Sequence, residues 1–397
     1  MKKKVISGIL MVMMLFVAIV TSTISSSAEN VTAVRLNKSV RDSGTEREAI
    51  IYKISVPSAG RLNVNFKHAN LYDTKTYWTI EVLANDLETV LQTVKSTGVD
   101  TNLTAYTLGV DKGTYYIKVW ARKDCDDNYN DGMYTLTPKF KKSSVWEIEY
   151  NQKTKKTNDS QAAARGIAPN KRAYGVIAGD NDVDFYKVRI TKKGYVTLNF
   201  RHKNILESDE MWEVSLVNAK TDVITSYRSK GTRTGMVSPK IGVTPGTYYI
   251  KVSGYDYKYS DVDYSVMLAF KAANGWETEY NNRTGKFNDQ LTTANTIKLR
   301  KSVMGTLASE EDVDCYKIRI GATRRTAFIF NHKYIANRKI YYTVQVFNSN
   351  LQNLTTIRSY GVNSTIRSTL RLRKGTYYIK VFKGDVYRNG DYKLTVK

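Results

Sequence analysis

Hydrophobic and polar residues alternate with a period of two through most of the chain. In the stretch GRLNVNFKH, the apolar residues Leu62, Val64 and Phe66 occupy every second position, with polar residues between them. The same alternation returns in GYVTLNFRH at 194–202 and in RRTAFIFNH at 324–332. A period of two predicts strands with one face in a core and one face in water.

One seven-residue strand, GTYYIKV, occurs three times in the chain, with separations of 133 and 129 residues, at 113–119, 246–252 and 375–381. This period is too long for a solenoid repeat and suits a small independent domain. After an N-terminal segment at 1–28, we therefore predict three domains, at 29–145, 146–275 and 276–397.

Each unit contains seven or eight short strand patterns separated by turn residues. This arrangement predicts an all-β chain of three tandem antiparallel β-sandwiches of jelly-roll type. We expect helix only as short pieces, near 162–164 or 291–294.

The N-terminus has the composition of a secretory signal peptide. Three lysines at 2–4 precede an apolar run at 5–20 and a small-residue segment that ends at Ala28. The apolar run is shorter than a bilayer-spanning helix, so we predict a signal peptide at 1–28 and no transmembrane segment. The third domain continues to the last residue, and we therefore expect a secreted protein, extracellular or held at a cell surface without a covalent anchor. We also expect it to be a monomer.

The chain is strongly basic, with 61 lysines and arginines against 37 acidic residues and a net charge of +24. Removal of 1–28 takes away three lysines and no acid, which leaves +21. This charge favours anionic wall polymers, sulfated or sialylated glycans, or acidic lipid headgroups as partners, with solubility alone as the alternative. The basic residues are dispersed and no nucleic-acid-binding signature is present, so we expect no nucleic acid partner. Cys125 and Cys315 lie at non-equivalent positions, and we expect no structural disulfide.

Further motifs recur in step with the repeat. WEIEYN at 146–151 returns as WETEYN at 276–281, and DVDFYKVRI at 182–190 returns as DVDCYKIRI at 312–320. Together with GTYYIKV and a closing strand, this order resembles the bacterial pre-peptidase C-terminal domain family, which includes the collagen-binding domains of clostridial collagenases. The resemblance covers nearly all of the second and third domains, whereas the first lacks the acidic segment. It implies compact, non-catalytic β-sandwiches; several family members bind calcium, and some bind collagen or polysaccharide.

Carboxylates alternate along the segments that enter the second and third domains. An extended backbone would place the oxygens of Glu147, Glu149 and Asn151 on one side, and calcium needs six to eight oxygen ligands from such segments. The loop before the next strand offers more acids, at Asp180, Asp182 and Asp184 and again at Glu311, Asp312 and Asp314. Calcium-binding relatives use similar positions. The predicted ligands are Glu147, Glu149, Asn151, Asp180 and Asp182 in the second domain, and Glu277, Glu279, Asn281 and Asp312 in the third.

The first domain offers too few carboxylates for such a site. The alternative for the other two domains is that these acids cap turns and balance the basic surface.

GTYYIKV divides by face. Tyr115, Ile117 and Val119 are expected in the core, which turns the residues between them outward. The predicted ligand-binding residues are Tyr116, Lys118 and Trp120 in the first domain, Tyr249, Lys251, Tyr255, Tyr257 and Tyr259 in the second, and Tyr378 and Lys380 in the third. Aromatic rings beside cations suit sugar faces, collagen-like chains and anionic groups. The alternative is that these tyrosines only pack across neighbouring strands.

These features predict a secreted, non-enzymatic protein that binds an extended extracellular polymer, either collagen-like or a polysaccharide. His68, His202 and His332 lie one per domain, too dispersed for a zinc or nucleophilic site, and are expected to be structural. Two alternatives remain: a wall or matrix component held by charge alone, and a secreted glycosidase that uses a carboxylate pair.

Overall fold

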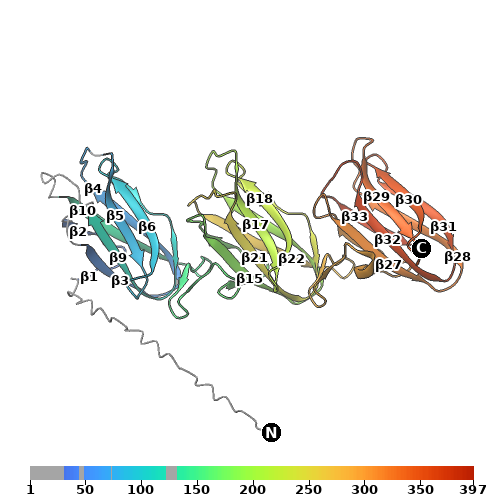
Figure 1. Cartoon of the computed structure of the whole chain (residues 1–397), viewed down its shortest axis with the longest axis horizontal. Helices are drawn as coiled ribbons and strands as arrows, with labels where there is room; N and C mark the ends of the chain where they lie inside the picture. The colour runs from blue at the N-terminus through green and yellow to red at the C-terminus, as the bar shows by residue number, and fades with distance from the viewer. Residues whose placement is uncertain (1–30, 44–48, 73, 122–131) are drawn as a thin grey trace, which may run out of the picture.

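The computed structural model describes residues 31–43, 49–72, 74–121 and 132–397. The described part is built almost entirely of β-strands, and it forms three sandwiches that follow one another along the long axis of the molecule (Figure 1). The prediction of an all-β chain of tandem sandwiches is therefore confirmed. The predicted signal peptide at 1–28 lies outside the described residues.

The first sandwich packs two sheets face to face, and consecutive strands pass repeatedly from one sheet to the other. Its first sheet has the order β1 (Val31–Ala33), β3 (Ile50–Val56), β9 (Gly113–Ala121), β5 (Thr76–Leu83), β6 (Val90–Thr97). Its second sheet has the order β2 (Val40–Ser43), β10 (Met133–Lys142), β4 (Gly60–His68), with β7 (Asn102–Thr104) and β8 (Leu108–Val110) both beside β4.

The second sandwich repeats this plan. Its first sheet has the order β13 (Arg165–Ile167), β15 (Val183–Ile190), β21 (Gly246–Gly254), β17 (Glu210–Asn218), β18 (Val223–Lys230). Its second sheet has the order β14 (Ala173–Gly175), β22 (Tyr264–Ala272), β16 (Gly194–His202), with β19 (Gly235–Val237) and β20 (Ile241–Val243) both beside β16.

The third sandwich has the same arrangement with fewer strands. Its first sheet has the order β25 (Asn295–Thr296), β27 (Val313–Ile320), β32 (Gly375–Lys383), β29 (Ile340–Phe347), β30 (Asn353–Tyr360). Its second sheet has the order β26 (Ser302–Thr306), β33 (Asp391–Val396), β28 (Arg324–His332), β31 (Thr365–Leu372). Pairing is antiparallel within the sandwiches, except that the short edge strands β1, β13 and β25 pair in parallel with their neighbours.

A short hairpin precedes each of the last two sandwiches. The first is β11 (Tyr150–Asn151) with β12 (Lys156–Thr157), and the second is β23 (Tyr280–Asn281) with β24 (Lys286–Phe287). β23 also pairs with β20, so the second hairpin extends a sheet of the preceding sandwich. Residues 291–293 form one 3-10 turn, at one of the two places where a short helix was predicted. Within the described ranges, no helix has the length and apolar character needed to span a bilayer.

Each sandwich has its own hydrophobic core between its two sheets. The repeated strand GTYYIKV supplies the centre of the first sheet each time, and in β9 the side chains of Tyr115, Ile117 and Val119 are buried as predicted. A pair of core tyrosines also recurs, one from each sheet, with hydroxyl groups in hydrogen-bond contact: Tyr52 with Tyr134, Tyr186 with Tyr264, and Tyr316 with Tyr392.

Candidate metal centres at the two junctions

The segment that enters the second sandwich is bound to both neighbouring sandwiches. The Glu147 amide donates to the Tyr174 carbonyl at 2.8 Å, and the Glu149 amide donates to the Gly109 carbonyl of the first sandwich at 3.1 Å. A Cβ at Gly109 would lie 2.4 Å from the Glu147 carbonyl oxygen, so only glycine permits this approach. We call the region formed by residues 146–159 and its contacts with both sandwiches the first junction.

The segment at 276–289 forms an equivalent second junction. The Glu277 amide donates to the Met304 carbonyl at 2.8 Å, and the Glu279 amide donates to the Gly242 carbonyl of the preceding sandwich at 3.0 Å. The Tyr280 hydroxyl accepts a hydrogen bond of 2.7 Å from the Asn218 side chain. The same backbone geometry therefore occurs at both junctions.

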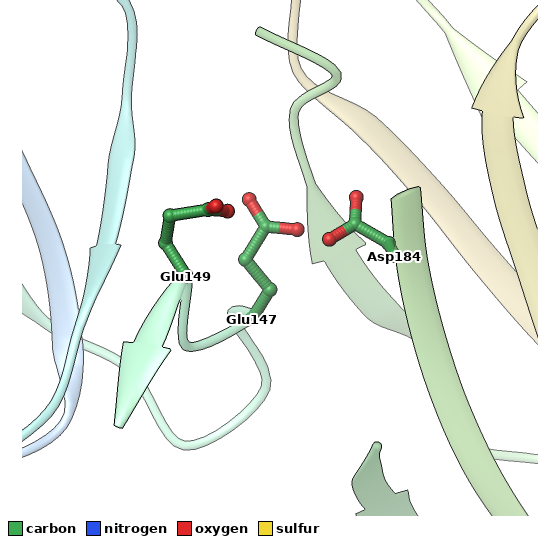
Figure 2. A group of neighbouring side chains, drawn as sticks. All are labelled: Glu147, Glu149 and Asp184. Atoms are coloured by element: carbon green, nitrogen blue, oxygen red, sulfur yellow. The ribbon is translucent and has the colours of Figure 1, made fainter. Parts of the chain in front are cut away.

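Five carboxylates gather at the first junction, in two overlapping groups that share Glu149. Within each group, one oxygen of every member lies within 4.8 Å of the others: Glu147, Glu149 and Asp184 in one, and Glu149, Asp159 and Asp182 in the other. Figure 2 shows the first group, in which Glu147 and Glu149 rise from the linking segment and Asp184 faces them from β15. The carboxylates thus come from the two separate segments that the sequence indicated.

The second junction repeats the cluster with equivalent residues. Its two groups are Glu277, Glu279 and Asp314, and Glu279, Asp289 and Asp312. Each of the two carboxylate clusters can hold a metal ion. To this extent the predicted metal sites are confirmed.

Hydrogen bonds fix the inner carboxylates of the first junction. Asp184 is fully buried, and it accepts hydrogen bonds from the Asn158 amide and the Tyr264 hydroxyl. Glu147, which is 2% exposed, accepts from the Val176 amide at 2.9 Å. These inner carboxylates are therefore held in place before any ion binds.

Burial and mutual repulsion raise the pKa values of these acids. Burial, followed by the charge of Asp184, raises the pKa of Glu147 well above its usual range. Burial raises the pKa of Asp182 to about 8 and that of Asp184 to about 6. At the second junction, burial and the neighbouring acids likewise raise the pKa values of Glu277 and Glu279. None of these carboxylates forms an ion pair in the described part of the chain, so a bound cation would supply a close counter-charge.

Several buried oxygens at both junctions have no hydrogen-bond donor. They belong to Asn158 and Asp182 at the first junction, and to Glu279, Asn288 and Asp312 at the second. A cavity of about 200 Å³ at the first junction is lined by Glu147, Glu149 and Asp182, together with Tyr106 and Gly109 of the first sandwich. Unpaired buried acceptors are costly unless a donor or cation satisfies them, and an all-oxygen ligand set suits a hard divalent ion. The residues present therefore fit such an ion.

Three predicted positions lie outside the clusters. The Asn151 side-chain oxygen accepts hydrogen bonds of 3.0 Å from the Lys153 and Thr154 amides, because β11 ends there in a tight turn. Asn281 does the same with the Arg283 and Thr284 amides. Asp180 lies exposed in the loop before β15 and belongs to neither group, and Glu311 is likewise exposed. The two asparagine side chains therefore shape the hairpin turns.

Four cluster residues were not among the predicted ligands: Asp184 and Asp314 had been named only as candidates, and Asp159 and Asp289 were missed entirely. Asp159 and Asp289 each follow an asparagine directly after the strand that closes the linker hairpin, in TND at 157–159 and FND at 287–289. The recurrence of this Asn-Asp pair at the repeat spacing was the available signal.

The first sandwich has no equivalent cluster among its described residues. Ile50 occupies the strand position that Asp184 holds in the second sandwich, and the core tyrosine Tyr52 donates instead to Asp42 on β2, at 2.7 Å. This is the arrangement expected from the missing aspartates of the first repeat.

The predicted tyrosine and lysine residues lie on the outer face of each first sheet. Tyr116, Lys118, Trp120, Lys251, Tyr378 and Lys380 are half-buried there. Tyr249 is only 8% exposed, which corrects the expectation of an accessible ring; it lies between Lys187 and Val217 on the flanking strands.

Tyr255, Tyr257 and Tyr259 do not form an extended row. The Tyr255 and Lys258 backbones bond to each other at 3.0 Å, and Asp256 and Tyr257 have positive φ angles of 53° and 59°. The chain therefore reverses in a tight turn that leaves Tyr257 89% exposed at its tip. The predicted alignment of the three rings is wrong, because the strand ends at Gly254.

The histidines are bound within their sandwiches, as expected. The Nδ1 atoms of His68, His202 and His332 each lie 2.6–2.8 Å from the next residue's carbonyl oxygen. Cys315 is buried with a free thiol, and Cys125 lies outside the described residues.

No family model and no curated protein sequence matches this chain. Among solved structures, it is similar to the pre-peptidase C-terminal domain of a collagenase from Bacillus anthracis, with 23% identity over 26% of this chain and 94% of that one, at a TM-score of 0.23. It is also similar to the M60 catalytic domain with two CBM51 domains of Clostridium perfringens ZmpB, with 8% identity over 89% and 54% of the two chains, at a TM-score of 0.20. The CUB1-EGF-CUB2 region of human MASP-1/3 is a third similar structure, with 9% identity over 59% of this chain and 100% of that one, at a TM-score of 0.19. Likenesses this distant carry no argument about function, and the fold rests on the strand pairing described above.

Proposed function

We propose that this chain is a secreted, non-catalytic protein of the pre-peptidase C-terminal type. Its three sandwiches bind an extended extracellular polymer, collagen-like or polysaccharide, through the outer faces of their first sheets. Calcium at the two junctions fixes the sandwiches relative to one another.

The observation that carries this proposal is a cation placed over an aromatic ring on the same face of every sandwich. Lys118 lies 5.4 Å from the Trp120 ring centre, and Lys380 lies 5.3 Å from that of Phe382. In the second sandwich, where Ser253 replaces the aromatic residue, Arg228 lies 3.9 Å from the Tyr255 ring centre. A ring beside a cation suits the carbon face of a sugar or an imino acid next to a polar or anionic group.

Three such faces in a row suit an extended ligand better than a small one. Binding at a single face would be weak, but linked sites that engage one polymer together gain avidity. Attachment of each junction segment to both neighbouring sandwiches supports a fixed spacing of the faces.

Burial supports a non-catalytic role. A glycosidase needs two carboxyl groups that flank a sugar in an accessible cleft. Here Glu147 and Asp184 are buried and hydrogen-bonded within the first junction, and Glu277 and Asp314 are buried at the second. Their positions suit an ion rather than a substrate.

Calcium is the proposed ion because the donors are carboxylate and amide oxygens contributed by the linking segment, its hairpin and the first residues of the following sandwich. Such a set suits a hard cation that takes six to eight ligands at irregular geometry. The protein's own residues would hold the ion, and the ion would neutralise the crowded carboxylates.

The proposal is tested by pull-down of the mature chain on immobilised collagen, a neutral wall polysaccharide and a sulfated glycan, at low and high salt. We expect binding to at least one polymer to survive high salt, because exposed charge contacts are screened whereas ring contacts are not. Complete release from all three polymers in high salt would favour the charge-held wall component instead.

A triple variant tests the faces directly. Trp120→Ala, Tyr255→Ala and Phe382→Ala together should lower polymer affinity by tenfold or more, since three linked contacts are lost. The control is Tyr334→Ala, which removes an exposed ring elsewhere on the third sandwich. Equal affinity of the triple variant and the control would contradict the proposed faces, and turnover of a glycan abolished by Asp182→Asn would favour an enzyme.

A further inference from the structure

A second cavity, of about 420 Å³, lies at the first junction and shares no lining residue with the cavity beside the carboxylate cluster. Its walls come from β4, the end of β10 and the following residues in the first sandwich, and from β14, β16 and β22 in the second. The volume is in the range of sites for small ligands. None of the residues proposed above for polymer binding lines it.

One wall of this cavity is aromatic and rigid. The rings of Trp146 and Tyr174 are stacked, with centres 5.9 Å apart and planes 8° from parallel. The Arg165 guanidinium holds the backbone beneath them by donating to the Ser144 and Trp146 carbonyls. A fixed aromatic wall of this kind suits the carbon face of a sugar ring.

The other walls are basic. Arg61, Lys141, Lys142 and Arg201 line the cavity, against the single acid Asp263. Arg61 lies 5.5 Å from the Trp146 ring centre, which places a guanidinium at the edge of the aromatic wall. Among the described residues, none of these four cations takes part in an ion pair. The cavity therefore has an excess of positive charge without an internal partner.

The second junction closes the same place with its own side chains. Tyr195 replaces Arg61, Ala272 replaces Lys142, and Asn331 replaces Arg201, so three of the four cations are lost. The Lys240 ammonium lies 5.1 Å from the Trp276 ring centre and 5.2 Å from that of Tyr195.

Lys240 also pairs with Asp391, the equivalent of Asp263. Thr107 stands in place of Lys240 at the first junction, so neither this cation nor its ion pair is present there. The first junction thus keeps the aromatic wall, leaves it open, and surrounds it with cations.

We propose that the first junction binds an acidic sugar unit of an anionic polysaccharide, with the sugar ring against Trp146 and Tyr174 and its carboxylate or sulfate between Arg61 and Arg201. Guanidinium groups bind planar carboxylates and sulfates in pairs of hydrogen bonds, which gives the site its preference for anions. Ser143 and Ser265 also line the cavity and bring hydroxyl groups that can bond sugar hydroxyls. This site goes beyond the proposed outer faces and does not depend on them.

The test is titration calorimetry of the full mature chain with tetragalacturonate, a sulfated tetrasaccharide and uncharged cellotetraose. We expect one site per chain for the acidic sugars and at least tenfold weaker binding of cellotetraose. Whichever of the carboxylated and sulfated probes binds more tightly identifies the anion. Equal binding of cellotetraose, or equal binding of a tetraglutamate peptide, would overturn an acidic-sugar site.

Two variants locate the site. Arg61→Gln should weaken the acidic tetrasaccharide at least tenfold, and Arg61→Tyr, which copies the second junction, should do the same while keeping a bulky side chain. The control is Arg325→Gln, an exposed arginine at the equivalent position of the third sandwich. Unchanged affinity in both Arg61 variants, with unchanged thermal unfolding, would overturn the site.

The outer faces and the cavity can fail separately. Phe382→Ala on the outer face should leave tetrasaccharide affinity unchanged. If Phe382→Ala weakens the tetrasaccharide and Arg61→Gln does not, the cavity is excluded and the outer faces take the acidic sugar. If only Arg61→Gln weakens it, the cavity site stands even where the outer faces bind no polymer.

Discussion

The two junctions share their carboxylate clusters and differ in the region beside the equivalent tryptophan, Trp146 at the first junction and Trp276 at the second. Both gather five carboxylates from the linking segment and the following sandwich, in the same two overlapping groups. Beside this cluster, the second junction places Lys240 against Trp276 and pairs it with Asp391, whereas the first junction leaves an open, basic, aromatic cavity. The comparison separates a repeated structural feature, the carboxylate cluster, from a feature of the first junction alone, the open cavity.

The largest expected effect is the stabilisation of the folded chain by calcium at the carboxylate clusters. An ion bound only by the folded form at a hundred times its dissociation constant stabilises that form by about 2.7 kcal/mol. Calcium should therefore raise the melting temperature of the mature chain by several degrees relative to chelator, as measured by scanning calorimetry.

Hydrogen exchange shows which segments calcium stabilises. Peptides that cover 147–159 and 277–289 should both gain protection with calcium, and peptides of β4 in the first sandwich serve as the control. Protection at only one junction would break the equivalence of the two clusters.

The second effect is pH dependence. Burial raises the folded-state pKa values of Asp182 to about 8 and Asp184 to about 6, above the unfolded value near 3.9. The metal-free folded state therefore holds more protons than the unfolded state, and its free energy of unfolding should fall as pH rises from about 4 through 8.

Calcium competes with these protons, so saturating calcium should restore stability at pH 8 and bind more weakly at pH 5. Urea unfolding at both pH values, with chelator and with calcium, checks both statements. A metal-free chain that is more stable at pH 8 than at pH 5 would contradict the carboxylate assignment.

The third effect tests the backbone contacts that both junctions share. A Cβ at Gly109 or Gly242 would lie 2.4 Å from the carbonyl oxygen of Glu147 or Glu277. Gly109→Ala and Gly242→Ala should therefore each cost about 1–3 kcal/mol by pushing the linking segment away. Thermal unfolding measures the loss, with Gly321→Ala as the control, because nothing lies within 4 Å of its Cβ position. A neutral effect at either junction would show that the segment is not tightly attached there.

The smallest expected effect comes from the Lys240–Asp391 ion pair, which only the second junction has. The Lys240–Asp391 pair is about one-third exposed, and partly exposed pairs contribute at most about 1 kcal/mol. Lys240→Ala should therefore change the melting temperature by no more than a few degrees. It should also open a cavity beside Trp276 at the second junction, where Lys240 now lies. Weak binding of an acidic tetrasaccharide at a second site in this variant would sharpen the comparison. Complete loss of the third sandwich's fold would contradict the minor role given to the pair.

The fold could be predicted because its signals are local and repeated. The alternation through GRLNVNFKH and the three copies of GTYYIKV specify strands, their buried faces and the number of sandwiches. The inward placement of Tyr115, Ile117 and Val119 follows from the period alone.

The candidate sites were predictable only in part, because turns interrupt the period. Extrapolating the alternation from Glu147 and Glu149 to Asn151 failed where β11 enters a turn, and the same extrapolation failed from Tyr255 to Tyr259. Asp159 was missed because it joins the cluster from the residues that follow the return strand of the hairpin, outside the alternating segment. The cavity beside Trp146 depends on contacts between two sandwiches, which no single strand pattern encodes.

The most direct test of the account counts calcium ions. Equilibrium dialysis of the mature chain, followed by elemental analysis, should find calcium at both junctions. Glu147→Gln combined with Asp182→Asn should remove the calcium of the first junction and leave that of the second, and Glu277→Gln with Asp312→Asn should do the reverse. A wild-type chain without bound calcium would contradict the proposed metal centres. A first-junction variant that binds as much calcium as the wild-type chain would contradict them as well.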